Sequence, residues 1–316
     1  MKNKIYYWSS DTSLNSGEGI LANKFLAKLK KKNPNIRLIP INNEKRSKGN
    51  LIGNYIMPFL GVIKIWKYSL KNNHTCYVNY LPLWNFLLFL FLPRKTILGP
   101  ITGTIIDRKF NKIINLMNVL STKIITIKYN KILLASNFFI KNFKKKKNLF
   151  SNFILSDFNK SYIVKNKEFD FVIYYRKYST KGNLFIYNIV KLLIKKNYYI
   201  AIIGDKFPSY KNIKNFGYIK KNEVYEIVSK SKYSISSAEN LYSFFNQDCL
   251  SKNLIIFYNK IFENYCEFFK NQLIPIDYSN YKISYKIILH YIKNVKLKKN
   301  KTKIKFNFNY DDYFIF

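Results

Sequence analysis

Two cations follow an apolar run in the middle of the sequence, and together they could bind an anion. Residues 169–175, Phe-Asp-Phe-Val-Ile-Tyr-Tyr, are typical of a buried strand, which ends at Arg176. A short polar turn follows, and Lys181-Gly182 then precedes an amphipathic helical pattern. In an open α/β sheet this strand-to-helix edge is where ligands bind, and free helix N–H groups favour an anion there. A guanidinium fork and a mobile ammonium suit a pyrophosphate, although two solvated cations on a very basic protein are the alternative.

The first half of the sequence alternates short strand-like runs with helical patterns. A polar, glycine-bearing loop at residues 9–19 leads into a helix with Leu21, Phe25, Leu26 and Leu29 on one face. Residues 84–92 form an apolar run between two prolines, which we predict to be a buried or interfacial helix because it is too short to span a membrane. The predicted strands are residues 4–8, 36–41, 75–81, 96–98, 123–127 and 131–136.

A second series of the same kind follows a polar connection at residues 155–167. Its helices are predicted at residues 184–194, from an N-cap at Asn222 to Val228, and through Leu250. Its strands are predicted at residues 169–175, 198–203, 233–236 and 254–258. Strand and helix alternation predicts an α/β fold of two doubly wound Rossmann-like domains that face a cleft. The expected domains are residues 1–158 and 159–296, with a tail at 297–316 that packs back on the first domain.

The composition limits the classes of function. The 316 residues are 48% hydrophobic, which is enough for packed cores and excludes a mostly disordered protein. The formal charge of +38 suggests a nucleic-acid partner, but the lysines are spread along the chain with only short runs, such as residues 144–147. A field of this size should still attract the protein to anionic surfaces, such as the inner face of a membrane. We therefore expect no nucleic-acid partner and treat an anionic membrane surface as a candidate partner.

The cysteines and the amino-terminal residues indicate the compartment. Cys76, Cys249 and Cys266 are odd in number and lack metal-ligand spacing, so we expect reduced thiols in a cytoplasmic protein. Residues 1–11 become polar too soon for a signal peptide. We expect no metal and no cofactor.

Four segments resemble the nucleotide-sugar glycosyltransferases of the GT-B fold, specifically the family 4 type. Ser-Gly-Glu-Gly at 16–19 is similar to the family's glycine-rich acceptor-side loop, and residues 175–182 are similar to its R-x-x-x-x-K-G motif. Residues 216–228 resemble the stretch that begins with a glycine-aromatic pair and continues into a helix. Residues 236–251 resemble the segment that holds two spaced acids.

The resemblance implies a metal-independent transfer of a sugar from a nucleotide diphosphate-sugar to an acceptor hydroxyl. It implies that Arg176 and Lys181 hold the diphosphate and that Glu239 approaches the transferred sugar or its pyrophosphate. Where the family has its ribose-binding acid, this chain has Gln247, and the nearest acid is Asp248. Either residue could bind the ribose. Other donor-binding candidates are Gly17, Gly19, Thr102, Gly217, Asn240, Leu241, Tyr242 and Ser243.

Several candidates have a structural interpretation that is about as good as the functional one. Gly99 to Gly103 stands where relatives carry a histidine, and it is either a donor contact through Thr102 or only a tight turn. Glu18 could contact a sugar hydroxyl or simply be solvated. His74 is expected in a surface loop, and His290 is expected to be packed or half-exposed on a helix.

Three hypotheses of the function are therefore open. The first is a glycosyltransferase that builds a cell-envelope polysaccharide or a lipid-linked glycan. The second is a catalytically inactive GT-B protein that binds glycans. The third is a basic nucleic-acid-binding protein, which should show a clustered basic face and a steep dependence on salt.

Overall fold

A computed structural model describes residues 4–13, 16–40, 57–71, 73–79, 81–102, 111–143, 148–150, 167–266, 269–294 and 309–314. The lysine run at 144–147, almost all of the connection predicted at 155–167 and most of the predicted tail lie outside these residues. The chain divides into two compact units, Met1–Phe153 with Asn307–Phe316 and Ile154–Phe306. Each unit is described by itself.

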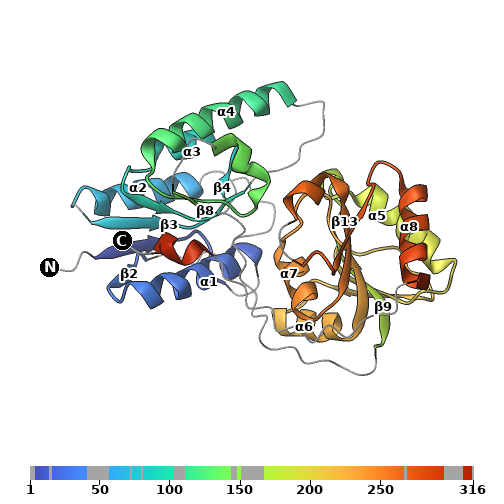
Figure 1. Ribbon diagram of the computed structural model, residues 1–316. Helices are drawn as coiled ribbons and strands as arrows, with labels where there is room; N and C mark the ends of the chain where they lie inside the picture. Colours follow the sequence, from blue (N-terminus) through green and yellow to red (C-terminus); the bar gives the residue numbers. More distant parts are fainter. Residues whose placement is uncertain are drawn as a thin grey trace. The chain divides into compact units, whose positions relative to one another are not determined.

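The first unit contains a parallel sheet with helices on both faces. The strands β1 (Ile5–Trp8), β2 (Ile36–Leu38), β3 (His74–Tyr77) and β5 (Thr96–Leu98) lie in the order β2-β1-β3-β5. Helix α1 (Gly17–Lys32) covers one face, and α2 (Met57–Ser69), α3 (Phe86–Phe91) and α4 (Asn111–Lys128) lie together on the other (Figure 1). Two short parallel pairs extend this unit, β4 (Leu81–Pro82) with β6 (Ile101–Thr102) and β7 (Ile132–Leu133) with β8 (Leu149–Phe150).

Residues from the end of the sequence complete the first unit. The Tyr313 hydroxyl donates to the Leu98 carbonyl at 2.6 Å, and Asn33 Nδ2 donates to the Phe314 carbonyl at 2.7 Å. The rings of Tyr313 and Phe314 both pack against Phe25 of α1, with the centroids 6.4 and 4.9 Å from that of Phe25. Tyr313 and Phe314 are therefore part of the core of this unit.

The second unit is a six-stranded parallel sheet with strand order β11-β10-β9-β12-β13-β14. Its central strand β9 (Phe169–Tyr175) is an almost fully buried apolar run, as expected for a parallel strand covered on both faces. The other strands are β10 (Ile200–Gly204), β11 (Ile213–Gly217), β12 (Ser231–Ile235), β13 (Ile255–Asn259) and β14 (Leu273–Ile276).

Four helices cover this second sheet. Helices α5 (Asn183–Ile194) and α8 (Tyr281–Asn294) lie on one face, and α6 (Lys221–Ser229) and α7 (Phe244–Ser251) lie on the other (Figure 1). Residues of α5 such as Ile189 and Val190 are fully buried against the sheet at the spacing expected of an amphipathic helix. Each unit therefore has the predicted doubly wound α/β architecture.

Several sequence predictions need correction. Residues 123–127, predicted as a strand, form the last part of α4, because their apolar side chains continue the periodicity of an 18-residue helix. The N-cap of α6 is Lys220 rather than Asn222, and Glu223 accepts from the Lys220 N–H at 2.8 Å. His74 begins strand β3 instead of lying in a loop, whereas His290 lies on α8 and is exposed.

Candidate functional site

The candidate phosphate ligands of the second unit lie at the carboxyl edge of its sheet. Strand β9 lies between β10 and β12, with Tyr175 paired to Gly204 and Val172 paired to Ser234. Arg176 follows β9 directly, and a short 3-10 helix, Ser179–Lys181, leads to α5. The segments after these three strands therefore meet at one edge, as in other ligand-binding α/β sheets.

Three tyrosine rings surround Arg176. Its guanidinium carbon lies 5.9 Å from the ring centroid of Tyr174, 5.3 Å from that of Tyr178 and 5.6 Å from that of Tyr218, within the range of cation–π contacts. Its Nη1 donates to the Tyr174 hydroxyl at 3.2 Å. Its Nε is shielded from solvent and makes no hydrogen bond to the described residues, with Asp205 Oδ2 3.7 Å away. The tyrosine rings thus hold the Arg176 guanidinium in place, and its Nε donates no hydrogen bond to the described residues.

Asp205, at the end of β10, supports this arrangement electrostatically. Partial burial raises the pKa of its carboxyl, but hydrogen bonds from the Tyr218 hydroxyl and the Lys177 N–H, with Arg176 nearby, outweigh burial and leave the pKa below its usual value. Burial lowers the pKa of the Arg176 guanidinium, but the phenols of Tyr174 and Tyr218 outweigh that effect, so this pKa is raised. The charged forms of both groups are therefore favoured.

Lys181 and Glu239 form the second contact at this edge. Glu239, in the segment after β12, is buried and forms an ion pair with Lys181 Nζ. The Ala238 N–H donates to the Lys181 carbonyl at 3.1 Å, which connects the two segments a second time. Between Lys181 and α5 lies Gly182, whose φ of 74° and close approach to Ala238 leave little room for a side chain. The structure therefore brings together two of the three predicted catalytic residues in direct contact.

The loop after Glu239 is held against the start of α7. Ser243 is the N-cap of α7 and accepts from the Asn246 N–H at 3.2 Å. Asn246 Nδ2 donates to the Leu241 carbonyl at 2.8 Å, and Asn240 Oδ1 accepts from the Tyr242 N–H at 3.0 Å. Leu241 and Tyr242 are buried, so their side chains are part of the core and any contact with a ligand would use their backbone.

Gln247 and Asp248 are both buried on α7. Gln247 Nε2 donates to the Tyr242 carbonyl at 2.8 Å. Asp248 forms an ion pair with Lys221 at the first position of α6, and Lys221 Nζ lies 4.8 Å from the ring centroid of Tyr225. Lys221 was not a candidate from the sequence, because only the packing of α6 on α7 brings it to Asp248.

Gly217 ends β11 at the same edge and has a φ of 68°. The space where its side chain would lie is open, and Tyr218 follows directly. The residues of the second unit that share this edge are therefore Arg176, Lys181, Asp205, Gly217, Tyr218 and Glu239.

The glycine-bearing segment of the first unit forms the first turn of α1. Ser16 is the N-cap and accepts from the Gly19 N–H at 2.8 Å, with Gly17 and Glu18 between them. A Cβ at Gly19 would overlap the Ser13 carbonyl, so this position requires glycine.

Polar residues surround this turn at the carboxyl ends of β1 and β3. Ser10 donates from its hydroxyl to Glu18 Oε1 at 3.3 Å and to Asn79 Oδ1 at 2.9 Å. Thr102 lies in β6, where its carbonyl accepts from the Leu83 N–H at 2.8 Å and joins β6 to β4. Gly17, Gly19 and Glu18 thus lie together with Ser10 and Asn79, two polar residues that the sequence did not single out.

The described residues contain no group of three or more histidine, cysteine, aspartate or glutamate side chains placed to hold a metal ion. Cys76, Cys249 and Cys266 form no disulfide bond with one another, and burial raises the pKa of the Cys76 and Cys266 thiols.

The sequence matches no protein-family model and no curated protein. Solved structures do resemble the chain in fold. A mutant of TarM from S. aureus, in complex with fondaparinux, alpha-GlcNAc-glycerol and UDP, aligns at a TM-score of 0.53 and 14% identity over 74% of this chain and 52% of its own. This chain thus spans about half of the TarM structure.

Two further structures align over most of both chains. HepE from Anabaena, in complex with UDP and glucose, has a TM-score of 0.57 and 9% identity over 92% of this chain and 90% of its own. A protein from Listeria monocytogenes assigned as a UDP-N-acetylglucosamine 2-epimerase has a TM-score of 0.58 and 8% identity over 93% of this chain and 89% of its own. At these identities the likeness shows the fold, which is the predicted GT-B class of two Rossmann-like domains.

Proposed function

We propose that this protein is a glycosyltransferase that moves a sugar from a nucleoside diphosphate-sugar to an acceptor hydroxyl. The observation that supports this most directly is the convergence of Arg176, Lys181 and Glu239 at the carboxyl edge of the second sheet. The structures of similar fold include TarM and HepE in complexes with UDP, which agrees with a nucleotide-sugar ligand. The assignment to the family 4 type remains a prediction.

The proposed mechanism is electrostatic stabilisation of the leaving group. Departure of a nucleoside diphosphate concentrates negative charge on its phosphates, and donors already in place lower the barrier. Arg176 is held by three tyrosine rings and its side chain is 29% exposed, so the exposed part of its guanidinium would donate to a phosphate. Lys181, partly exposed, would exchange Glu239 for a phosphate oxygen, which frees the Glu239 carboxylate to face the sugar. These cations can neutralise the diphosphate, and we propose metal-independent transfer.

We propose that the remaining candidates bind the nucleoside and the acceptor. Asp248 remains the proposed ribose ligand, with Gln247 as the alternative. Both side chains are buried, with Asp248 paired to Lys221 and Gln247 bonded to the Tyr242 carbonyl, so binding of the ribose requires one of these bonds to be exchanged. Backbone groups of residues 240–243 and the open space at Gly217 would complete the donor site. Residues 159–296 are thus the proposed donor domain. Residues 1–158 are the proposed acceptor-side domain, completed by Tyr313 and Phe314 of the predicted tail at 297–316, with Gly17, Gly19 and Thr102 as the proposed substrate contacts.

The proposed acceptor is a saccharide or a lipid-linked saccharide of a cell envelope. The proposed location is the cytoplasm, at the inner face of a membrane, because an anionic surface would attract the positively charged chain.

A ligand screen tests the donor site directly. Thermal unfolding would be followed with UDP, GDP, ADP and CMP, and a true ligand at a hundredfold excess over its Kd stabilises by about 2.7 kcal/mol. We expect stabilisation by a nucleoside diphosphate. If all four are silent while the protein is retained on random DNA at physiological salt, the nucleic-acid reading replaces this one.

Substitutions test the chemistry. Arg176→Ala and Lys181→Ala are each expected to lower turnover of the preferred donor by roughly tenfold to a hundredfold, because each charge-assisted bond contributes about 1.5–3 kcal/mol. Lys196→Ala, which changes an exposed lysine just beyond the carboxyl end of α5, is the control and should leave turnover unchanged. Unchanged turnover in both site variants would overturn the site. Epimerisation of the sugar while it is still attached to the nucleotide would contradict the proposed glycosyl transfer. Glycan binding without any turnover would indicate a catalytically inactive glycan-binding protein.

A further inference from the structure

Three helices of the first unit expose apolar side chains on their outer surface. Helix α4 is apolar on both faces: it buries Ile125 and exposes Ile113, Leu116 and Ile127 at helical spacing. A helix of this kind normally has a partner on each face. We define the α2–α4 face by its exposed apolar residues, which are Leu60, Ile63, Trp66, Leu87, Leu90, Phe91, Ile113, Leu116, Val119, Leu120 and Ile127.

Hydrogen bonds join these helices into one surface. Trp66 Nε1 of α2 donates to the Phe91 carbonyl at the end of α3 at 2.7 Å. Lys128 Nζ of α4 donates to the carbonyls of Phe89 and Leu90 at 3.2 and 2.5 Å. The free carbonyls at the carboxyl end of α3 are thus satisfied by its two neighbours. The apolar residues therefore belong to a preformed surface.

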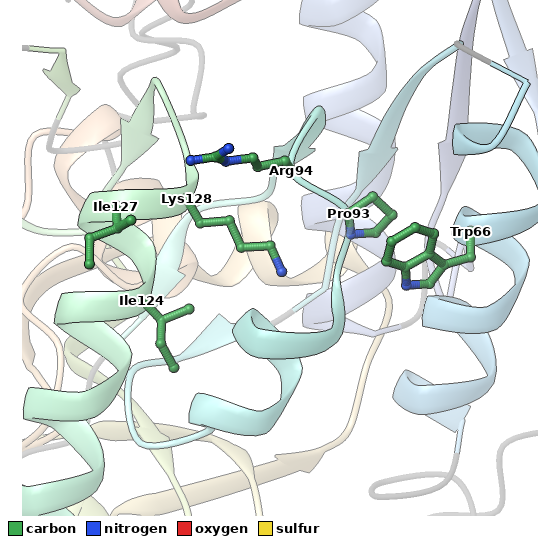
Figure 2. Close-up of a pocket in the computed structure, with 6 residues that line it drawn as sticks. All are labelled: Trp66, Pro93, Arg94, Ile124, Ile127 and Lys128. Carbon is green, nitrogen blue, oxygen red and sulfur yellow. The ribbon is translucent and has the colours of Figure 1, made fainter.

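The surface includes a shallow apolar pocket with two cations beside it. The pocket has a volume of about 400 Å³, and Figure 2 shows that its residues come from α2, from the turn after α3 and from α4. Its lining residues are Trp66, Pro93, Arg94, Ile124, Ile127 and Lys128. A second pocket of about 630 Å³ shares Arg94, Ile127 and Lys128 with the first and adds Lys95 and Lys131. An apolar pocket thus continues directly into a strongly basic one.

The charge of this region differs from that of the rest of the chain. Between residues 45 and 150 the sequence contains one acidic residue, Asp107, although the whole chain has 17. Helices α2, α3 and α4 contain no aspartate or glutamate, whereas α2 and α4 carry lysines among their exposed apolar residues. Biased codon usage can add lysines, but it does not explain why acids are missing from this region. The electrostatic complement of the surface is an extended array of negative charges.

We propose that the α2–α4 face binds the surface of an anionic phospholipid bilayer. The exposed apolar side chains enter the boundary between headgroups and acyl chains, and the indole of Trp66 suits this depth. Arg94 and Lys95 contact the lipid phosphates in the basic pocket, beside Lys128 and Lys131, whose ammonium groups also donate to backbone carbonyls. None of the helices in the described ranges is both long and apolar enough to cross a bilayer. This proposal rests on the first unit alone and does not depend on the donor site.

Vesicle cosedimentation tests the proposal on the full chain. We expect binding to vesicles of phosphatidylglycerol and phosphatidylcholine in equal parts, and no binding to phosphatidylcholine alone. Since each cation near an anionic bilayer contributes about fivefold to partitioning, Lys112→Gln with Lys123→Gln, two exposed lysines of α4, should weaken binding by about twenty-five-fold at low salt. The matched pair Lys195→Gln with Lys196→Gln, exposed on the second unit, should change it much less.

A second pair of variants tests the apolar contact. Leu116→Glu with Ile127→Glu replaces side chains that are 60% and 75% exposed, so folding should be preserved. We expect partitioning to fall at least tenfold, because apolar contact is lost and two repelled charges are added. The control is Leu184→Glu with Ile283→Glu on the second unit, at 69% and 51% exposure. Stabilisation by UDP, measured on the Leu116→Glu and Ile127→Glu variant, should equal that of the wild type.

Three outcomes would overturn the proposal. Absence of binding to anionic vesicles at low salt would remove the membrane as the partner. Equal losses of vesicle binding in the lysine variants of the first and second units would mean that the net charge of the protein, rather than this face, attracts the vesicles. A wild-type dimer that the Leu116→Glu and Ile127→Glu variant dissociates, without vesicle binding, would assign the face to a second copy of the chain.

Discussion

Replacing Lys181 with methionine tests whether it is a donor ligand or only the partner of a buried acid. Lys181→Met keeps the length of the side chain and removes its charge. The matched control is Lys230→Met at the C-cap of α6, where Lys230 pairs with Glu226 at 2.7 Å and more distantly with Glu168 at 3.9 Å. The two lysine side chains are 36% and 37% exposed, but the carboxylates differ, with Glu239 at 7% and Glu226 at 65%. A comparison of the two variants therefore isolates the burial of the carboxylate.

The expected magnitudes follow from these exposures. Leaving a buried polar group without its partner costs about 1–3 kcal/mol, and because Lys181 is itself partly solvated we expect about 1.5 kcal/mol for Lys181→Met. Breaking the exposed Lys230 pair should cost much less, because water solvates both of its charges. If Lys181 also binds the diphosphate, Lys181→Met should weaken UDP binding about tenfold, or about 1.4 kcal/mol.

The double variant Lys181→Met with Glu239→Gln separates the two roles. Glutamine removes the unpaired charge, so urea unfolding should show that much of the lost stability returns. Calorimetric titration should still show weak UDP binding, because the ammonium is still missing. Glu239→Gln alone should bind UDP at least as tightly as the wild type, since Lys181 loses its competing partner. If the double variant recovers UDP binding together with stability, Lys181 only neutralises Glu239 and the proposed donor site is wrong.

Two further predictions concern the stability of the second unit. Gly182→Ala should lower the free energy of urea unfolding more than Gly217→Ala does. Both glycines have a positive φ, which costs a residue with a side chain about 1–2 kcal/mol, but only at Gly182 would the new Cβ lie 3.0 Å from that of Ala238. Equal losses of stability would contradict the close contact. Asp277, whose carboxylate accepts from Lys260 Nζ at 2.6 Å, has its pKa lowered to about 2 by that bond. Its contribution is therefore fully present above about pH 4 and is lost as the pH falls through 2, so Asp277→Asn should destabilise by about 1 kcal/mol at pH 7 and by much less at pH 2; a difference that does not depend on pH would contradict this.

The strand at the centre of the second unit could be predicted because its sequence has few alternatives. Residues 169–175 are apolar except for Asp170, include several β-formers and are bounded by polar residues, and the structure assigns the same limits to β9. Arg176 and Lys181 could therefore be placed at an edge of the sheet. Their neighbours could not, since the strand order that puts β10 and β12 on either side of β9 depends on packing across the whole unit.

Errors occurred where short apolar runs suit either secondary structure. Residues 123–127 contain β-branched side chains and were predicted as a strand, yet they continue α4, where Ile125 packs in the core and Ile127 is exposed. The ion pair between Lys221 and Asp248 was also missed. No local pattern connects two residues that belong to different helices, and their contact follows from the packing of α6 on α7.

The burial of Tyr313 and Phe314 in the first unit has a consequence for biosynthesis. These residues follow the whole second unit in the sequence, so a ribosome makes them only after both sheets have been translated. Until then α1 lacks the rings that pack on Phe25, and the Leu98 carbonyl lacks its phenol donor. The second unit can therefore reach its native packing during translation, while the unit translated first is completed last.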